Sequence, residues 1–322
     1  MMKQLSKELK SELKSVYEYL QKLLETSEPF LAEIKDYFTH QKGKLLRPLL
    51  TLLSGKLENR ESQEMLTKAA ASLEILHMAT LVHDDILDKA QLRRGQSTIY
   101  QKWDVNVAIL FGDFLYAKSL SYLDGLPNNI TSILARTIVQ MVEGEMQQQR
   151  NRFKANLSKD EYLLCIKKKT GSLLATSCKI GAIIGRLDED KIERLTTYGY
   201  YLGISFQIQD DILDYKNKPE TTGKTTQNDL QRGIITLPFI HYFQSLSTSK
   251  QAEFNEILND QPSDQQVQNI ISQVNASSAL DASLTLAQEF SQKAIETIDP
   301  LPSSEYKGYL IKLARYSFKR SK

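Results

Sequence analysis

Two stretches of this 322-residue chain carry the same five residues, Asp84-Asp85-Ile86-Leu87-Asp88 and Asp210-Asp211-Ile212-Leu213-Asp214. Each stretch lies in an apolar run with helical spacing, from Leu76 to Leu87 and from Tyr201 to Leu213. On a helix, the first and last aspartates of each stretch lie one turn apart on the same face. Carboxylates in an apolar run are costly unless something neutralises them. The repeat therefore predicts two acidic helix faces that turn toward one shared site.

Two such faces would gather up to six carboxylate groups, three from each stretch. A cluster of this kind cannot stay ionised without cations. Hard oxygen ligands that leave coordination positions for water and phosphate suit Mg²⁺. The sequence thus predicts a helical cavity that holds several Mg²⁺ ions and, through them, a diphosphate.

The bulk composition is that of a globular protein, with 41% hydrophobic and 25% charged residues. The net charge of +2 gives no argument for a nucleic-acid partner or an anionic membrane. We find no uninterrupted apolar run of about 18 residues and no signal peptide, so we expect no transmembrane segment and a cytoplasmic location. Cys165 and Cys178 are expected to be buried free thiols, with a disulfide as the alternative.

Helix-period patterns dominate the chain, and strand patterns are hard to find. No linker rich in Pro, Gly or Ser divides it, so we expect one all-α domain over residues 1–322, a bundle of long helices. Loops are expected at Lys89–Thr98 and Tyr215–Thr236. Helices are expected at Leu5–Leu24, Arg47–Leu57, Met65–Asp88, Val105–Tyr122, Asn129–Arg152, Lys159–Gly185, Lys191–Tyr215, Leu237–Gln244, Gln251–Leu258, Ser263–Val274, Ala279–Ile298 and Ser304–Lys319.

Basic residues occur next to both the first acidic stretch and an upstream helix start. Lys44 and Arg47 lie at the start of a predicted helix, and a helix N-terminus with two cations suits a diphosphate. Arg93 and Arg94 follow the first acidic helix directly and could hold phosphate oxygens bidentately. Each pair also has a simpler interpretation, as part of a solvated basic loop.

Further polar residues lie on other predicted elements. Lys169 and Thr170 offer a cation and a hydroxyl, and Gln207 stands three residues before the second acidic stretch. Lys224 lies in the loop after that stretch, where it could close over a bound phosphate. The alternatives are a core amide for Gln207 and a mobile surface loop for Lys224.

His77 lies two turns before Asp84 on the same helix face, either as a core histidine or as a hydrogen-bond donor to a diphosphate. Glu74-x-x-His77 also has the spacing of helical di-iron proteins, which use that motif twice. His83-Asp84 is similar to the pair found in metal-dependent phosphohydrolases, which need several histidine ligands. The chain has only four histidines, and no other one follows a glutamate at that spacing.

Together these motifs resemble the trans-polyprenyl diphosphate synthases. The likeness runs from about Lys42 to Pro238, and it is strongest to the larger, catalytic component of bacterial two-component hexaprenyl or heptaprenyl diphosphate synthases. It implies an all-α bundle around a deep central cavity. The motifs that carry it are both Asp-Asp-x-x-Asp stretches, Gly43-Lys44-x-x-Arg47-Pro48, Arg93-Arg94-Gly95, Lys169-Thr170 and Phe206-Gln207-x-x-Asp210-Asp211.

The resemblance implies a role for each site residue. Asp84 and Asp88 would bind Mg²⁺ that bridges to an allylic diphosphate, and Asp210 a further Mg²⁺ from the opposite wall. Supporting roles fall to Asp85, Asp211 and Asp214, with Glu145 and Gln148 more distant. The allylic substrate would be contacted by Arg93, Lys169, Gln207 and Lys224, and Thr170 would join Gln207 in offering dipoles to a carbocation. The diphosphate of isopentenyl diphosphate would be held by Lys44, Arg47, His77 and Arg94.

The implied activity is Mg²⁺-dependent condensation of isopentenyl diphosphate onto an allylic primer, farnesyl diphosphate. The product would be all-trans, about C30–C35, and used for menaquinone side chains. The resemblance implies a dimer, with a small regulatory subunit favoured over a second identical chain, and the apolar helix Val105–Tyr122 as an interface. The alternatives are a non-catalytic or regulatory subunit, which usually lacks an aspartate motif, and a terpene cyclase, which typically has only one.

Product length is expected to depend on the depth of the cavity. Ala79 and Thr80 stand five and four residues before Asp84, where short-chain members often carry an aromatic ring. Their small side chains would let the growing tail pass, although a packing role in the core is the alternative. Replacing Ala79 with Phe is therefore expected to shorten the product to about C15–C20. The wall would continue along Leu76 and Leu73, with Ile138 and Leu134 on the facing side.

Overall fold

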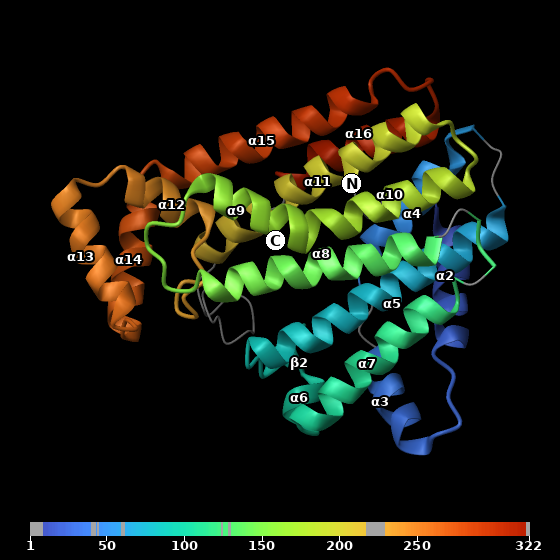
Figure 1. The fold of residues 1–322 in the computed structure, drawn as a ribbon, viewed down its shortest axis with the longest axis horizontal. Helices are drawn as coiled ribbons and strands as arrows, with labels where there is room; N and C mark the ends of the chain where they lie inside the picture. Colours follow the sequence, from blue (N-terminus) through green and yellow to red (C-terminus); the bar gives the residue numbers. More distant parts are fainter. Residues whose placement is uncertain are drawn as a thin grey trace.

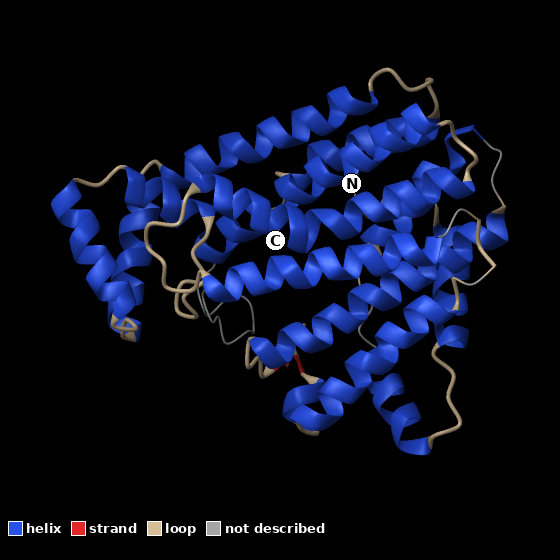
Figure 2. Cartoon of the chain, viewed as in Figure 1, coloured by secondary structure: helices blue, strands red, loops and turns tan. Residues whose placement is uncertain are grey.

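The computed structural model describes residues 9–39, 43, 45–58, 62–123, 125–127, 130–216 and 229–319. Helices make up most of these residues, which confirms the predicted all-α fold (Figures 1 and 2). The helices are α2 (Lys10–Leu23), α3 (Pro29–Thr39), α4 (Leu46–Gly55), η1 (Lys56–Glu58), α5 (Gln63–Leu87), α6 (Ile99–Lys102), α7 (Val105–Ser121), α8 (Ile130–Arg150), α9 (Lys159–Ile166), η2 (Lys167–Gly171), α10 (Ser172–Ile184), α11 (Glu189–Lys216), α12 (Leu237–Gln244), α13 (Thr248–Asn259), α14 (Asp264–Ala276), α15 (Ala279–Ile298) and α16 (Glu305–Ser317). The strands are β1 (Leu92–Arg93) and β2 (Gln96–Ser97).

Side-chain caps fix the starts of several helices. Ser62 caps α5, where its hydroxyl accepts the backbone N–H of Met65. Ser158 and Glu161 form a capping box that starts α9. These caps set the register of two helices that carry or support the site, since α5 bears the first acidic stretch at its C-terminal end.

Two apolar clusters form the core, and α11 belongs to both. The larger cluster packs α2, α4, α5, α7 and α10 against the first half of α11, where Tyr198 is fully buried. The other packs the second half of α11, including Ile208, against α12, α14 and α15. Figure 1 shows α13 and α14 extending beyond the main bundle at the end of α15. Because one helix contributes to both clusters, we propose that the chain forms a single domain.

Close contact between α10 and α11 depends on two glycines of α11. A Cβ at Gly199 would lie 2.5 Å from the Cα of Ala175, and one at Gly203 would lie 2.6 Å from the Cα of Gly171. Only glycine permits helix axes to approach so closely at these positions. The contact brings the start of α10 next to the part of α11 that precedes the second acidic stretch.

The structure differs from the expected elements in three places. The single helix expected over Lys159–Gly185 is interrupted by a π-helical turn, η2. Helices α3 and α6 were not expected. The loop expected at Lys89–Thr98 contains the β1–β2 hairpin, whose turn residues Arg94 and Gly95 have φ of 51° and 80°. Positive φ at both central residues is typical of a type I′ turn.

Helix α5 is the one helix, among the described residues, that is long and apolar enough to cross a membrane. However, 61% of its most apolar window is buried within the protein, which is typical of a core helix. Cys165 and Cys178 are both free and buried, as expected.

Candidate active site

Both acidic stretches reach one cavity of about 1060 Å³. Asp84 lines it from the C-terminal end of α5, and Asp210 and Asp214 line it from the C-terminal half of α11. Lys44 and Lys224 lie outside the described residues. The other residues that were expected to bind substrate all line the same cavity: Arg47, His77, Arg93, Arg94, Lys169, Thr170 and Gln207.

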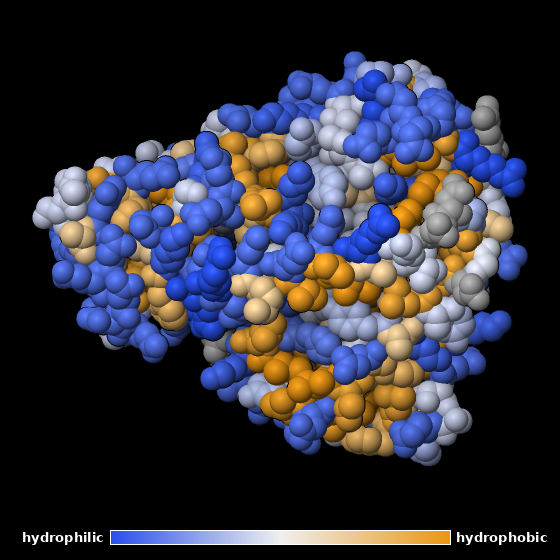
Figure 3. Space-filling model, in the orientation of Figure 1, coloured by the Kyte–Doolittle hydropathy of each residue, from blue (hydrophilic) through white to orange (hydrophobic). Residues whose placement is uncertain are grey.

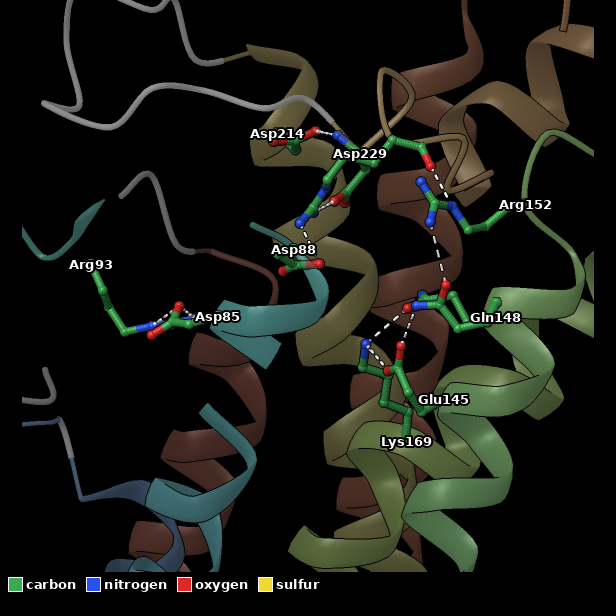
Figure 4. Close-up of polar contacts among 11 residues, drawn as sticks. Asp85, Asp88, Arg93, Glu145, Gln148, Arg152, Lys169, Asp214 and Asp229 are labelled. Carbon is green, nitrogen blue, oxygen red and sulfur yellow. Dashed lines mark hydrogen bonds and ion pairs between the residues drawn. The ribbon is translucent and has the colours of Figure 1, made fainter. Parts of the chain in front are cut away.

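The three aspartates of the first stretch lie in three different environments, and Figure 4 shows two of them, Asp85 and Asp88. Burial raises the pKa of Asp84 to about 6, against the opposing effect of the Lys169 charge. Asp85 is only 3% exposed, and one of its oxygens accepts Nε of Arg93 at 2.8 Å and Nη2 at 2.7 Å. Asp88 ends α5 and pairs with Arg232, whose Nη1 lies 2.5 Å from Oδ1. Asp84 is therefore the member of this stretch that faces the cavity.

The second stretch places its middle aspartate among neutral donors instead. Asp211 is 3% exposed and accepts the hydroxyl of Tyr162 at 2.6 Å and Nε2 of Gln207 at 2.8 Å. Burial raises the pKa of Asp211 well above its ordinary value, and the nearby charge of Asp229 adds to the effect. Asp214 accepts the backbone N–H of Asp229 at 2.9 Å, which ties α11 to the segment that follows the second stretch (Figure 4).

The π-helical turn η2 carries Lys169 and Thr170 into the middle of the cavity wall. Such turns are rare and frequently occur at functional sites. Helix α8 packs closely against η2 because Gly144 has no side chain: a Cβ there would lie 2.7 Å from the backbone nitrogen of Lys169. The hydroxyl of Thr170 donates to Oε1 of Gln207 at 2.7 Å. Thr170, Gln207 and Asp211 thus form one hydrogen-bonded chain across η2 and α11.

Lys169 is held by two side chains of α8 (Figure 4). Its Nζ lies 2.5 Å from Oε2 of Glu145 and donates to Oε1 of Gln148 at 2.8 Å. Burial alone would favour the neutral amine, but Asp84 and Glu145 outweigh it and raise the pKa of Lys169. The lysine is therefore a fixed positive charge beside the first acidic stretch.

A separate basic group surrounds the buried carboxylate of Glu74, which is 6% exposed. Burial raises the pKa of Glu74, and the charges of Arg47 and Arg94 oppose that shift. Burial also lowers the pKa of His77 well below its ordinary value, and the neighbouring arginines lower it further, so this histidine is neutral. Nε of Arg47 is buried without a hydrogen-bond partner among the described residues. This group therefore has unused donors for an anion.

The geometry does not favour the two metal-enzyme alternatives based on histidine. Glu74 and His77 lie among arginines, whose charges would repel a metal ion. The ring of His83 packs on α7, where a Cβ at Gly112 would lie 2.1 Å from its Nε2. In the part of the chain that the structure describes, no three His, Cys, Asp or Glu side chains form a ready-made metal site.

The polyprenyl synthetase family model matches residues 28–274, which is most of the chain. This chain belongs to the polyprenyl synthetase family. It is 34% identical to heptaprenyl diphosphate synthase component 2 of Bacillus subtilis, over 94% of this chain and 86% of that protein. The component 2 protein of Geobacillus stearothermophilus is also 34% identical, over 97% of both chains. A geranylgeranyl pyrophosphate synthase of Geoglobus acetivorans is 33% identical, over 98% of this chain and 99% of that protein. Relatives at similar identity are therefore named for products of different length.

Solved structures of polyprenyl synthetases have the same fold as this member of the family. Heptaprenyl diphosphate synthase from Staphylococcus aureus superimposes with a TM-score of 0.90 at 31% identity, covering 98% of this chain and 99% of that one. A polyprenyl synthase from Caulobacter crescentus, solved in complex with calcium and isoprenyl diphosphate, gives a TM-score of 0.93 at 29% identity, covering 99% and 98%.

The residues expected to form the product tunnel lie mostly behind the wall of this synthetase's cavity. Thr80 lines the cavity, together with Met141 of α8 and Leu173 of α10. Ile138 is partly buried against the larger core cluster. Fully buried in the core, and not in the cavity lining, are Ala79, Leu76, Leu73 and Leu134.

Sequence reasoning missed two residues that shape the site, Tyr162 and Arg232, and gave a third, Glu145, too small a role. Tyr162 anchors Asp211 from α9 and has no motif around it that would signal this role. Glu145 was recognised only as a supporting residue, whereas it contacts Lys169 directly. Arg232 contacts Asp88 from the segment before α12, and the only sequence signal was its spacing of three residues from Asp229.

Proposed function

We propose that this polyprenyl synthetase is an Mg²⁺-dependent trans-prenyltransferase that condenses isopentenyl diphosphate onto farnesyl diphosphate. The observation that carries the proposal is the arrangement of charge in one cavity. Its acidic part, with Asp84 and Asp210, adjoins the cations Arg93 and Lys169, while a second basic group surrounds Glu74. The allylic diphosphate needs metal ions in order to leave, whereas isopentenyl diphosphate only needs to be held. The acidic part therefore suits the allylic substrate, and the basic group around Glu74 suits isopentenyl diphosphate.

The acidic part has the donor set for a divalent cation. Asp84, Asp88 and Asp210 would hold Mg²⁺, which when bound supplies the positive charge that neutralises a departing diphosphate. Burial is the main cause of the raised pKa of Asp84, and the charges of Glu145 and Asp88 add to it, so a bound cation would favour the ionised carboxylate. The calcium and isoprenyl diphosphate in the Caulobacter synthase support the same combination of ligands here.

The chain's own residues would orient the allylic substrate. Arg93, whose fork is fixed by Asp85, and Lys169, fixed by Glu145, would bind its diphosphate oxygens. The Thr170 hydroxyl oxygen keeps a lone pair after donating to Gln207, so it can face positive charge that develops on the allylic carbon. These dipoles are preorganised, because Asp211 and Tyr162 hold the other end of the hydrogen-bonded chain.

The second basic group would hold isopentenyl diphosphate. Arg47 and Arg94 supply charge, and neutral His77 supplies one hydrogen bond without adding repulsion to the arginines. Leu173, Leu202 and Phe206 line the same cavity and would keep water away from the reacting carbons. The double bond of isopentenyl diphosphate then attacks the allylic carbon, and loss of a proton, to the released diphosphate, completes each addition.

We assign a product of about C30–C35 on the likeness to the heptaprenyl synthase components, with an elongation path past Thr80, which lines the cavity. A Phe at position 80 would project from the cavity wall, whereas a Phe at position 79 must first displace core side chains. Thr80→Phe is therefore the cleaner test of the expected shortening. An unchanged product from a folded Thr80→Phe enzyme would rule out this path.

We also assign the chain to a dimer that forms through α7 and α8. Five apolar side chains on these helices are well exposed, and Figure 3 shows apolar residues gathered over both helices: Ile109 at 41%, Leu110 at 67%, Val139 at 57%, Val142 at 52% and Met146 at 65%. Val142 and Met146 also line the cavity, so Ile109, Leu110 and Val139 are the exposed apolar side chains of this group outside it. Exposed apolar surface of this kind is typical of a protein interface. The names of two relatives, each component 2 of a heptaprenyl diphosphate synthase, favour a second, different component over a second copy. We take that component to be a small regulatory subunit, and we assign the enzyme a cytoplasmic role in menaquinone side-chain synthesis.

A single assay tests the activity. The purified chain is incubated with Mg²⁺, farnesyl diphosphate and labelled isopentenyl diphosphate, alone and with a candidate small subunit, and the products are separated by length. Labelled polyprenyl diphosphate supports the proposal, and its appearance only after the subunit is added supports two-component assembly. Cyclic hydrocarbon, free phosphate or no turnover under either condition would overturn it.

A further inference from the structure

One guanidinium connects the two acidic stretches. Arg232 places Nη1 2.5 Å from Oδ1 of Asp88 and Nη2 2.5 Å from Oδ1 of Asp229. Asp229 in turn donates its backbone N–H to Asp214 at 2.9 Å. Figure 4 shows Asp88 and Asp214 on either side of Asp229. The end of the first stretch is therefore linked to the end of the second through Arg232 and Asp229.

The backbone of Arg232 is anchored away from α5. Its carbonyl oxygen accepts Nε of Arg152 at 2.6 Å, and the next carbonyl, that of Gly233, accepts the N–H of Phe153 at 2.7 Å. Gly233 has a φ of 78°, and a Cβ there would lie 2.6 Å from the Phe153 ring, so this turn packs directly on the end of α8. Only the side chain of Arg232 reaches across to Asp88.

The guanidinium of Arg232 thus places a positive charge beside Asp88, whose carboxylate is of the kind that binds a divalent cation. The pair is partly shielded from solvent, with side-chain exposures of 20% for Arg232 and 32% for Asp88. Asp229 holds the other half of the arginine fork, so the side chain can release Asp88 and still keep an ionic partner.

We propose that Arg232 is a built-in counter-ion that competes with the divalent cation for Asp88. In the empty site the guanidinium neutralises Asp88 and holds the two acidic walls together. Loading of metal and diphosphate displaces it from Asp88, while Asp229 retains it. Arg232 therefore sets the metal concentration at which the site fills. This inference rests on the proposed function, because it takes Asp88 to be a metal ligand.

The test measures Mn²⁺ binding to the substrate-free protein by the loss of the electron paramagnetic resonance signal of free Mn²⁺. Arg232→Gln removes the competing charge, so the apparent dissociation constant is expected to fall about fivefold, the factor set by a partly exposed ion pair. Arg232→Lys keeps the charge but loses the fork, so its affinity is expected to lie between those of Arg232→Gln and the unchanged protein. Arg194→Gln is the matched control, because Arg194 pairs with Asp190 on the exposed surface of α11.

The possible outcomes separate the two proposals. Binding of Mn²⁺ that Asp84→Asn abolishes supports the acidic site itself, and no binding in the unchanged protein would overturn the proposed function. If Mn²⁺ binds through Asp84 but Arg232→Gln binds it equally or more weakly, Arg232 is a structural bridge and the counter-ion proposal fails. Circular dichroism checks that each variant is folded. If Arg232→Gln does not fold, the Mn²⁺ affinity of Arg232→Lys decides between the two outcomes.

Discussion

Identical pentapeptides have unlike surroundings in the two halves of this site. In the first half, the buried middle aspartate Asp85 is neutralised by the charged fork of Arg93, which itself lines the cavity. In the second half, buried Asp211 is held by the neutral donors Tyr162 and Gln207. The first middle aspartate therefore orients a cation of the cavity wall, and the second joins the site to the core. A shared motif thus brings its first aspartate to the cavity in both halves, Asp84 and Asp210, without fixing what the middle aspartate does.

The largest effect is expected where the two halves are alike, at the aspartates that face the cavity. Asp84→Asn removes a proposed metal ligand from one wall, and Asp210→Asn removes one from the other. Each change is expected to lower kcat about a thousandfold, by loss of charge stabilisation in the transition state. Steady-state kinetics with farnesyl and isopentenyl diphosphates measure this, with surface Asp190→Asn as the control. A tenfold or smaller loss in either variant would mean that only one wall carries the metal chemistry.

A smaller effect is expected from a change at Asp85, the middle aspartate of the first stretch, and it should distinguish the two halves of the site. Asp85→Asn keeps the volume but leaves Arg93 without its charged partner, so the KM for the allylic diphosphate is expected to rise about tenfold to hundredfold. The KM for isopentenyl diphosphate should change little, because Arg47 and His77 lie in the other basic group. Equal rises in both KM values would show that Asp85 supports the whole cavity and not Arg93 in particular.

The matching change in the second half should act on stability. Tyr162→Phe removes a buried hydroxyl that donates to Asp211, and Tyr198→Phe is the control because its hydroxyl donates to the backbone carbonyl of Leu310 at 2.8 Å. Above the raised pKa of Asp211 the acceptor is charged, and a bond to a charged acceptor contributes about 1.5–3 kcal/mol against about 1 kcal/mol for a neutral one, so Tyr162→Phe should cost more free energy of unfolding there. Urea denaturation measures both.

The pH dependence of that difference follows from the pKa of Asp211. The Tyr162 hydroxyl favours the ionised carboxylate, whose pKa burial holds well above its ordinary value. The excess cost of Tyr162→Phe should therefore be greatest above that raised pKa and shrink as the pH falls through it and the carboxylate takes up a proton. An excess that grows toward low pH would contradict this assignment.

The sequence predicted what periodicity and chemistry determine locally. The one-turn spacing of Asp84 and Asp88, and of Asp210 and Asp214, followed from helical geometry, and the family's motifs pointed to Arg93, Lys169 and Gln207. It could not predict partners that meet only in the folded chain: Tyr162 reaches Asp211 from another helix, and Arg232 reaches Asp88 from the far wall. The π-helical turn at Lys167–Gly171 was also missed, because an extra residue within a helix leaves the apolar pattern of α9 and α10 nearly unchanged.

The smallest expected effect concerns the charge balance around Asp84 in the first half, which the ion pair of Lys169 with Glu145 influences. Burial raises the pKa of Asp84 to about 6, Lys169 lowers it, and Glu145 and Asp88 raise it, with Arg93 also lowering it. A metal ion requires the ionised carboxylate, so Mn²⁺ affinity should fall as the pH drops through about 6. The raised pKa also means that protonation of Asp84 favours the metal-free folded state, so its stabilising contribution is lost as the pH rises through that value.

Glu145→Gln tests this balance directly. Removing the Glu145 charge takes away one of the effects that raise the pKa of Asp84. It also frees Lys169 from its ion pair, so that the lysine can stabilise ionised Asp84. Both effects lower the pH midpoint of Mn²⁺ binding. The shift is expected to be about half a pH unit, since the two carboxylates interact across a solvated cavity. Paramagnetic resonance titrations between about pH 5 and 8 measure it, with Glu143→Gln as the matched control because Glu143 pairs with Lys168 on the exposed side of α8. If the midpoint rises or stays constant, neither the charge of Glu145 nor the release of Lys169 governs the titration of Asp84.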